Sequence, residues 1–328
     1  PDASYLITGG LGSLGLEVAQ YLATHGARHL VLTGRSGVST QYQRTAVQAS
    51  EDIGISVEVV TTDISDAAGV KKLLAGLPRL RGIVHAAGVL ADGMLIQQSS
   101  ESYEKVAGPK VKGAWHLHTH TQDRPLDFFV LFSSVASIIG SPGQSNYAAS
   151  NAFMDGLAHF RRRRGLAATA VNWGPWANVG MAASDLVMQR LLKDGWQPMN
   201  ASEGCSYMGQ LLTTHDLPQA AVLPVDWMQF VANTPGANEW STLKHCIPEE
   251  HVSPPVDDSA ELAAQKVKDA HPDQRLGLIV FYLLKRFAQT LRVPATDLDE
   301  LAKPTDLGID SLTAVEIQIW IRGDLQVD

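Results

Sequence analysis

The chain has 328 residues, of which 45% are hydrophobic and 18% are charged, so its composition is that of an ordinary globular protein. Its length suits one large core or two domains. The formal net charge of −8 argues against a nucleic-acid surface, because such a surface needs clustered Lys and Arg. The one basic run, Arg161–Arg164, follows an apolar helical pattern, and we interpret it as the solvated end of a helix.

The sequence does not indicate a metal site, a disulfide or a membrane segment. Cys205 and Cys246 lie far apart without CxxC spacing, and the histidines of residues 116–120 have no carboxylate or cysteine at a supporting spacing. No apolar run approaches the roughly 20 residues that span a bilayer, and the N-terminal residues begin a strand pattern rather than a signal peptide. We therefore expect a soluble, cytoplasmic protein.

From Ser4 to about Val171, short apolar runs alternate with longer helical patterns. The runs are SYLIT, HLVLTG, SVEVVTTD, GIVHAAG, LDFFVLFSS and TAVNWG. This alternation predicts βαβ units, and therefore the α/β fold class with a doubly wound, Rossmann-like parallel sheet. Between Met181 and Phe230, two amphipathic helical patterns and the strand-like AAVLPVDW are expected to cover a substrate cleft.

The first predicted strand runs directly into a glycine-rich turn and then a helix, which is the arrangement that holds a dinucleotide pyrophosphate. After the second strand, Arg35 and Ser36 stand where an NAD site would place Asp or Glu, so we expect NADPH; the alternative is that Arg35 only faces solvent. Further contacts are expected at the ends of the third and fourth strands. The predicted cofactor residues are Thr8, Gly9, Gly10, Gly12, Leu14, Gly15, Arg35, Ser36, Asp63, Ile64, Ala86, Ala87 and Gly88.

Reduction of a ketone needs a proton donor for the oxygen that becomes an alkoxide. A tyrosine can donate that proton, although its unperturbed pKa near 10 calls for a nearby cation. Ser134 ends the strand LDFFVLFSS, and Tyr147 lies on the following predicted helix with Asn151 one turn later on the same face. These three residues are the candidates for the reacting site.

The glycine loop, the HAAG segment, SSVASIIGSPGQSNYAASN and VNWGPWANVGMA resemble short-chain dehydrogenase/reductases, and in detail the catalytic half of ketoreductase domains of modular polyketide synthases. Most of the superfamily has lysine where this chain has Asn151. Polyketide ketoreductases take their lysine from an earlier helix, and Lys110 aligns with it, with Lys112 as the competitor. The resemblance implies that Tyr147 donates the proton and Ser134 binds the carbonyl oxygen. It also implies that Lys110 lowers the pKa of Tyr147 and holds the nicotinamide ribose, while Asn151 completes a polar relay.

The resemblance extends to stereochemical markers. Ketoreductases of the B-type, which give the D-configured β-hydroxyl, carry Leu-Asp-Asp after HAAG and a proline and an asparagine just before the tyrosine. This chain has Leu-Ala-Asp after HAAG, so Ala91 departs from the B-type pattern while Asp92 matches it. The tryptophan that marks the A-type would stand at position 139, where this chain has Ile139. B-type specificity is therefore expected, with no epimerising subtype because no proline stands at Ala149. The implied substrate and stereocontrol residues are Asp92, Pro142, Asn146, Trp176 and Met181.

The C-terminal part of the chain has a different character. Residues 233–272 are rich in Pro, Asn, Glu and Asp and predict a linker between a catalytic part, 1–232, and a small helical segment, 273–328. LGIDSL resembles the attachment site of acyl carrier proteins, which implies 4′-phosphopantetheine on Ser311 in an incomplete carrier domain. The alternative is that Asp310 or Ser311 only caps a helix.

The resemblance implies NADPH-dependent reduction of a carrier-bound β-ketoacyl thioester within a larger megasynthase. It also implies partner domains, including a structural subdomain that would precede Pro1. Two alternatives remain open: a stand-alone short-chain dehydrogenase acting on a free ketone, and a ketoreductase-like scaffold module without catalysis.

Overall fold

The computed structural model describes residues 2–177, 185–213, 217–234, 237, 240–247, 265–291, 317 and 321–322. The chain divides into two compact units. The first comprises Pro1–Ala91, Ser99–Ser141 and Ser145–Val252, and the second comprises Asp92–Gln98, Pro142–Gln144 and Ser253–Asp328.

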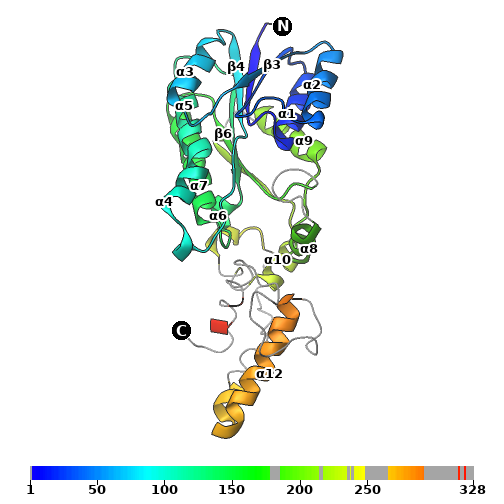
Figure 1. Ribbon diagram of the computed structural model, residues 1–328, viewed down its shortest axis with the longest axis vertical. Helices are drawn as coiled ribbons and strands as arrows, with labels where there is room; N and C mark the ends of the chain where they lie inside the picture. The colour runs from blue at the N-terminus through cyan, green and yellow to red at the C-terminus, as the bar shows by residue number, and fades with distance from the viewer. Residues whose placement is uncertain are drawn as a thin grey trace. The chain divides into compact units, whose positions relative to one another are not determined.

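The first unit is built on one parallel sheet of seven strands in the order β3-β2-β1-β4-β5-β6-β7 (Figure 1). The order reverses between β1 and β4, so the predicted doubly wound, Rossmann-like sheet is confirmed. Its central strands read as continuous apolar runs because helices cover both faces. The strands are β1 (Ser4–Thr8), β2 (His29–Gly34), β3 (Ser56–Thr61), β4 (Leu80–His85), β5 (Phe128–Ser134), β6 (Thr169–Trp173) and β7 (Gln219–Val222).

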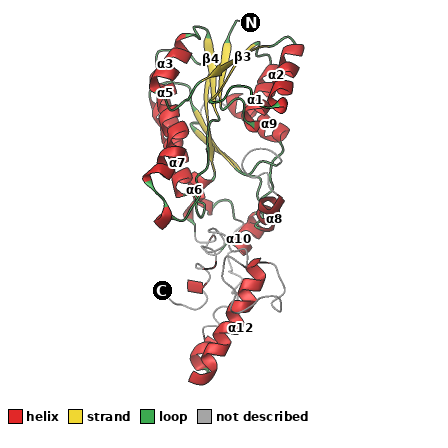
Figure 2. Cartoon of the chain, viewed as in Figure 1, coloured by secondary structure: helices red, strands yellow, loops and turns green. Residues whose placement is uncertain are grey.

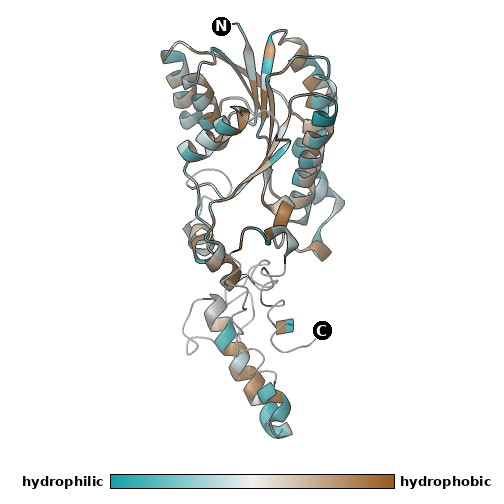
Figure 3. Cartoon of the chain, turned by 180° about the vertical axis from the view of Figure 1, so that it is seen from behind, coloured by the Kyte–Doolittle hydropathy of each residue, from teal (hydrophilic) through white to brown (hydrophobic). Residues whose placement is uncertain are grey.

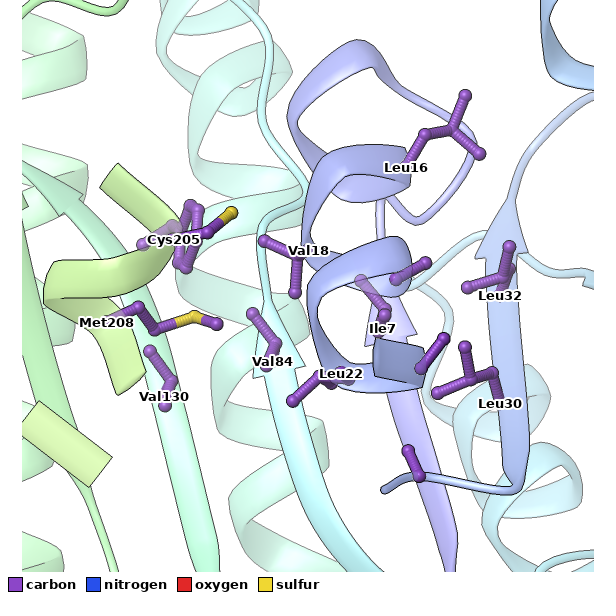
Figure 4. Close-up of a cluster of buried hydrophobic side chains, with 14 of the residues drawn as sticks. Ile7, Leu16, Val18, Leu22, Leu30, Leu32, Val84, Val130, Cys205 and Met208 are labelled. Atoms are coloured by element: carbon purple, nitrogen blue, oxygen red, sulfur yellow. The ribbon is translucent and has the colours of Figure 1, made fainter. Parts of the chain in front are cut away.

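Two helical layers cover the sheet (Figure 2). One layer contains α1 (Ser13–Thr24), α2 (Gln41–Asp52) and α9 (Ala201–Thr213), and the other contains α3 (Ala67–Ala75), α5 (Gly113–Thr119) and α7 (Ser145–Arg163). Each layer has its own apolar core, and in the first of them Met208 of α9 lies beside the strand residues Val84 and Val130 (Figure 4). The helices carry both hydrophobic and hydrophilic residues, as amphipathic covers of a buried sheet do (Figure 3).

Shorter elements follow the strands at their carboxyl ends. They are α4 (Ser100–Ala107), η2 (Gly108–Lys112), α6 (Ala136–Ile139), α8 (Asp185–Lys193), α10 (Trp227–Asn233) and η5 (Ser241–Leu243), with η1 (Leu95–Gln97) in the second unit. A third apolar cluster joins Trp196 and Phe230 to Ala237, Leu243 and Ile247. Residues 240–247, which composition predicted to be linker, therefore belong to the packed first unit, because their apolar side chains are buried there.

In the second unit, α12 (Pro272–Leu291) lies almost entirely within the predicted helical segment 273–328. The apolar side chains of α12 are not uniformly buried, since Leu276 is 72% exposed and Phe281 is 70% exposed. Ser311 and Met181 lie outside the described residues. None of the described helices is long and apolar enough to cross a membrane, and the described residues contain no group of three or more His, Cys, Asp or Glu that could hold a metal ion.

The interpretation of Arg161–Arg164 as a solvated run is wrong at its first residue. Arg161 is 1% exposed, its guanidinium lies 4.0 Å from the ring centroid of Phe129, and its Nε donates to the carbonyl oxygen of Ala167 at 3.0 Å. Its Nη1 lies 3.1 Å from Nδ1 of His118, which is itself buried. Burial lowers the pKa of Arg161 to about 10, and burial together with this guanidinium lowers the pKa of His118 to about 4.

Candidate active site

The glycine loop between β1 and α1 leaves no room for side chains. Gly9 has a φ of +69°, and a Cβ there would lie 2.8 Å from the Cα of Ala87. A Cβ on Gly15 would lie 2.2 Å from the carbonyl oxygen of Gly9. Gly12 precedes α1 and has no side chain that could cap it, so no side chain of this residue competes with an anion at the start of the helix. The loop fits a dinucleotide pyrophosphate.

The other predicted cofactor residues follow the carboxyl ends of β1 to β4, along one edge of the sheet. Arg35 and Ser36 are exposed just beyond β2, and Asp63 is exposed beyond β3, where its Oδ1 accepts from the backbone N–H of Ser65 at 2.8 Å. Ile64 is buried. The backbone N–H of Ala86 donates to the carbonyl oxygen of Thr8 at 3.0 Å, which ties the end of β4 to the glycine loop.

Tyr147, Asn151 and Lys110 form one buried group. The Nζ of Lys110 donates to Oδ1 of Asn151 at 2.9 Å and to the carbonyl oxygen of Phe132 at 3.1 Å, and it lies 5.0 Å from the ring centroid of Tyr147. The Nδ2 of Asn151 donates to the carbonyl oxygen of Tyr147 at 2.8 Å. Of the two candidate lysines, Lys110 lies beside Tyr147, whereas Lys112 is half exposed and paired with Glu104.

A turn of π-helix, η2, carries Lys110 into this group. Pro109 has no N–H to donate, so the regular hydrogen-bond ladder of α4 changes at this point. Gly88 makes room for the lysine stem, because a Cβ at Gly88 would lie 2.9 Å from Cε of Lys110. Burial lowers the pKa of Lys110 to about 7, and the carboxylate of Asp155 acts in the opposite direction.

Ser134 ends β5 beside the same group and is half-buried. Its Oγ accepts from the backbone N–H of Ala136 at 3.2 Å, and none of the described residues accepts its hydroxyl proton, which can therefore bind a ligand. Its carbonyl oxygen lies 2.8 Å from Oγ of Ser137 and 3.3 Å from Nδ2 of Asn172, both within hydrogen-bonding distance. Sequence analysis missed these two residues and Asp155. The signal for Asp155 was an acidic side chain on the apolar face of α7, two turns after Tyr147.

The predicted stereocontrol residues occupy two places. In the second unit, which also contains Pro142, Oδ2 of the exposed Asp92 accepts a hydrogen bond from Nε2 of Gln144 at 2.9 Å. Gln144 was not among the residues predicted from the sequence. Within the first unit, Nδ2 of Asn146 donates to the carbonyl oxygen of Ala91 at 2.7 Å, and its Oδ1 accepts from the backbone N–H of Tyr147 at 2.7 Å. Asn146 thus fixes the start of α7 to the segment that follows β4.

Trp176 was predicted to contact the substrate, but it is buried in the apolar core. It is 5% exposed, and its indole ring fills the space beside Gly204 of α9, where a Cβ would lie 2.3 Å from Cη2. Its ring centroid lies 5.0 Å from that of Trp173 and 6.4 Å from that of Phe132. The contacts of Trp176 are those of a core residue that seats α9, because the aromatic ring is enclosed on several sides.

His85, the last residue of β4, is buried and should make the free energy of unfolding depend on pH under acidic conditions. Its Nδ1 lies 2.6 Å from Oγ1 of Thr8, and burial, together with the charge of Lys110, lowers its pKa from 6.5 to about 3. Since the folded-state pKa is lower than the unfolded one, the unfolded state binds more protons below pH 6.5. The free energy of unfolding is then expected to fall by up to about 1.4 kcal/mol per pH unit for this one group.

Urea unfolding at a series of pH values between 7 and 4 measures this loss. His85→Asn should have a shallower pH dependence, whereas the same change at the exposed His25 should leave the slope as it is. The assignment to His85 would be contradicted by equal slopes in His85→Asn and the parent protein.

The parallel sheet with its glycine loop, and the buried lysine beside Tyr147, define a dinucleotide-dependent oxidoreductase of the α/β class.

Comparison with known proteins gives the family. Residues 3–178 match the family model described as "KR domain". Polyketide synthase GfsA of Streptomyces halstedii is 36% identical over 333 residues, which cover 97% of this chain and 4% of the synthase. The 6-methylsalicylic acid synthase of Aspergillus terreus is 34% identical over 352 residues, covering 99% of this chain and 19% of that protein. The chain thus spans a small part of the curated relatives that it matches.

Similar solved structures support the same family. A structure titled as an A1-type ketoreductase is 38% identical, with a TM-score of 0.69, and the match covers 74% of this chain and 53% of that one. PlmKR1, the ketoreductase from the first module of phoslactomycin biosynthesis in Streptomyces sp. HK803, is 33% identical with a TM-score of 0.68, over 72% of this chain and 56% of that one. The chain belongs to the ketoreductase domains of polyketide synthases, which are oxidoreductases that reduce β-keto intermediates with NAD(P)H.

Proposed function

We propose that this chain reduces a carrier-bound β-ketoacyl thioester to the β-hydroxyacyl thioester with NADPH. The observation that carries the proposal is the buried hydrogen-bonded group of Lys110, Asn151 and Tyr147 beside the end of β5. A reductase needs a proton donor and a cation at one place, and this group supplies both.

Each residue has a stated task in this proposal. When bound, the reduced nicotinamide supplies the hydride to the carbonyl carbon. Tyr147 transfers its phenolic proton to the oxygen, and Ser134 donates a hydrogen bond to that oxygen as its negative charge grows. Lys110 holds its ammonium near the phenol, so the tyrosinate left after proton transfer meets a positive charge. Asn151 orients the ammonium through the hydrogen bond at 2.9 Å.

The preference for NADPH is proposed from Arg35 and Ser36, which are exposed at the end of β2 and can bind a 2′-phosphate. Arg35→Ala is expected to raise KM for NADPH by about 10- to 100-fold, because a hydrogen bond to a charged group contributes about 1.5–3 kcal/mol. KM for NADH should change little, since NADH lacks that phosphate. Steady-state kinetics with each cofactor measures the difference. Arg44→Ala, an exposed arginine of α2, is the control, and equal losses with both cofactors would count against the proposed contact.

The D configuration of the product is proposed from Asp92, Pro142 and Asn146, with Ala91 as the departure from the B-type pattern. The hydrogen bond of Asp92 to Gln144 supports an ordered segment at that place. Two of the similar solved structures are an A-type and an A1-type ketoreductase, and these class names apply to those two proteins. Chiral chromatography of the β-hydroxyacyl product decides: an L-configured alcohol would exclude B-type specificity.

We also propose that 4′-phosphopantetheine is attached to Ser311 in the parent protein and that other synthase domains are the partners. The proposal is supported by similarity to multidomain synthases over 97% of this chain, which includes the LGIDSL segment. Incubation with coenzyme A and a phosphopantetheinyl transferase should add one phosphopantetheine to the chain, as measured by mass spectrometry. An unmodified chain, or equal modification of Ser311→Ala, would count against the assignment.

The decisive experiment supplies NADPH and a β-ketoacyl pantetheine thioester and follows NADPH oxidation. The proposal expects turnover of the thioester to exceed that of the corresponding free ketone. Equal turnover of both would favour a stand-alone dehydrogenase, and NADPH binding without any turnover would favour a scaffold module.

A further inference from the structure

A buried carboxylate lies below the proposed reacting group. Asp155 is 8% exposed and stands on α7, two turns after Tyr147 and one turn after Asn151. Its Oδ2 accepts from Oγ of Ser137 at 2.6 Å and from Nδ2 of Asn172 at 3.0 Å. Its Oδ1 is buried, and no hydrogen-bond partner for it is found in the described part of the chain. A carboxylate placed this deeply is costly unless something offsets its desolvation.

The carboxylate is connected to the strand end that carries Ser134. Oγ of Ser137 lies within hydrogen-bonding distance of both the Asp155 carboxylate, at 2.6 Å, and the carbonyl oxygen of Ser134, at 2.8 Å. Nδ2 of Asn172 lies 3.0 Å from the same carboxylate and 3.3 Å from the same carbonyl oxygen. The Nε2 of Gln219 donates to Oδ1 of Asn172 at 3.0 Å, which fixes the orientation of the amide. Asp155 therefore anchors the turn between β5 and α6.

The carboxylate also acts on the buried cation. The charge of Asp155 opposes the lowering of the Lys110 pKa by burial. Among the described residues, the Asp155 carboxylate is the charged group that favours the ammonium, while the neighbouring His85 is kept neutral mainly by its own burial. The ionisable side chains on the elements packed against η2 are Glu101, Tyr103, Glu104 and Lys105 of α4, His116 and His118 of α5, and Tyr147, Asp155, His159 and Arg161–Arg163 of α7, with His85 on β4.

We propose that Asp155 is a positioning residue of the reductase: its carboxylate, one helical turn after the Asn151 side chain that binds Nζ of Lys110, complements the charge of that ammonium, and through Ser137 and Asn172 it fixes the strand end that presents Ser134. The inference rests on the proposed roles of Lys110 and Ser134. It extends the reacting group by a carboxylate that touches neither the substrate nor the cofactor.

Asp155→Asn tests the charge while keeping the shape. The amide oxygen can still accept from Ser137 and Asn172, so the turn should persist, but the negative charge is lost. In the cofactor-free protein, NMR titration of the ¹⁵Nζ signal of Lys110, assigned by its loss in Lys110→Met, should move to lower pH by about one unit or more. The basic limb of the kcat profile should move in the same direction.

Ser137→Ala is the matched control, because it removes a hydrogen bond and keeps the carboxylate. It should lower kcat without moving the Lys110 titration or the basic limb. An unchanged Lys110 titration in folded Asp155→Asn would overturn the inference. The Lys110 titration of Asp155→Glu is a second test, which can be made whether or not Asp155→Asn folds. It retains the charge, so a Lys110 titration lowered as described for Asp155→Asn would also overturn the inference. These titrations need no turnover, so they stand apart from a failure of the proposed reaction.

Discussion

Tyr147→Phe is expected to lower kcat by about 10²- to 10⁴-fold while the affinity for NADPH changes little. The substitution removes only the phenolic hydroxyl. The ring packs with Val106 and Ala136 in a small buried cluster, so the phenylalanine ring should keep its place. Without the hydroxyl, the alkoxide oxygen has no positioned proton donor, whereas the glycine loop that holds the pyrophosphate is untouched. Single-turnover oxidation of NADPH, together with its fluorescence on binding, separates the two effects.

Tyr103→Phe is the matched control for this variant. Tyr103 is half-buried, and its hydroxyl donates to Oγ of Ser145 at the start of α7. Its loss should leave kcat within a few fold of the parent value. Undiminished turnover in Tyr147→Phe would exclude Tyr147 as the proton donor, and a loss of NADPH binding would show that the hydroxyl serves the cofactor instead.

Lys110→Met is expected to have the next largest effect, a fall in kcat of about 100-fold or more, the size typical of losing one preorganised group that meets developing charge. The methionine keeps much of the stem that passes Gly88, but the ammonium that lies 5.0 Å from the Tyr147 ring is gone. Because burial brings the pKa of Lys110 to about 7, its deprotonation should contribute a basic limb to the pH profile of the parent enzyme. That contribution should vanish in the variant.

Lys112→Met is the control, since Lys112 lies two residues away, half exposed, and pairs with Glu104. An exposed pair of this kind contributes little to stability, so both kcat and the pH profile should remain. Equal losses in the two variants would contradict the assignment of Lys110. Retention of the basic limb in Lys110→Met would assign that limb to another group.

The sequence by itself determined the fold class and the place of the cofactor loop. Buried parallel strands must be apolar on both faces, so SYLIT and LDFFVLFSS could be recognised as strands without knowledge of their neighbours. The glycine loop is equally local, because a positive φ at Gly9 and the close contact behind Gly15 are requirements of a few consecutive residues. The family resemblance placed Lys110 and Tyr147 in one site, although 37 positions of numbering, from 110 to 147, separate them.

Tertiary structure alone decided which polar and aromatic side chains are buried, because that depends on contacts between distant segments. Arg161 lies in a run that looks solvated, yet it is enclosed by Phe129 and His118. Trp176 packs against Gly204 and is part of the core. Residues 240–247 lie within the range predicted to be a linker, but Leu243 and Ile247 complete an apolar cluster with Trp196. Asp155 became a candidate for the same reason: the burial of its carboxylate, with Ser137 and Asn172 hydrogen-bonded to it, arises only when α7, β5 and β6 come together.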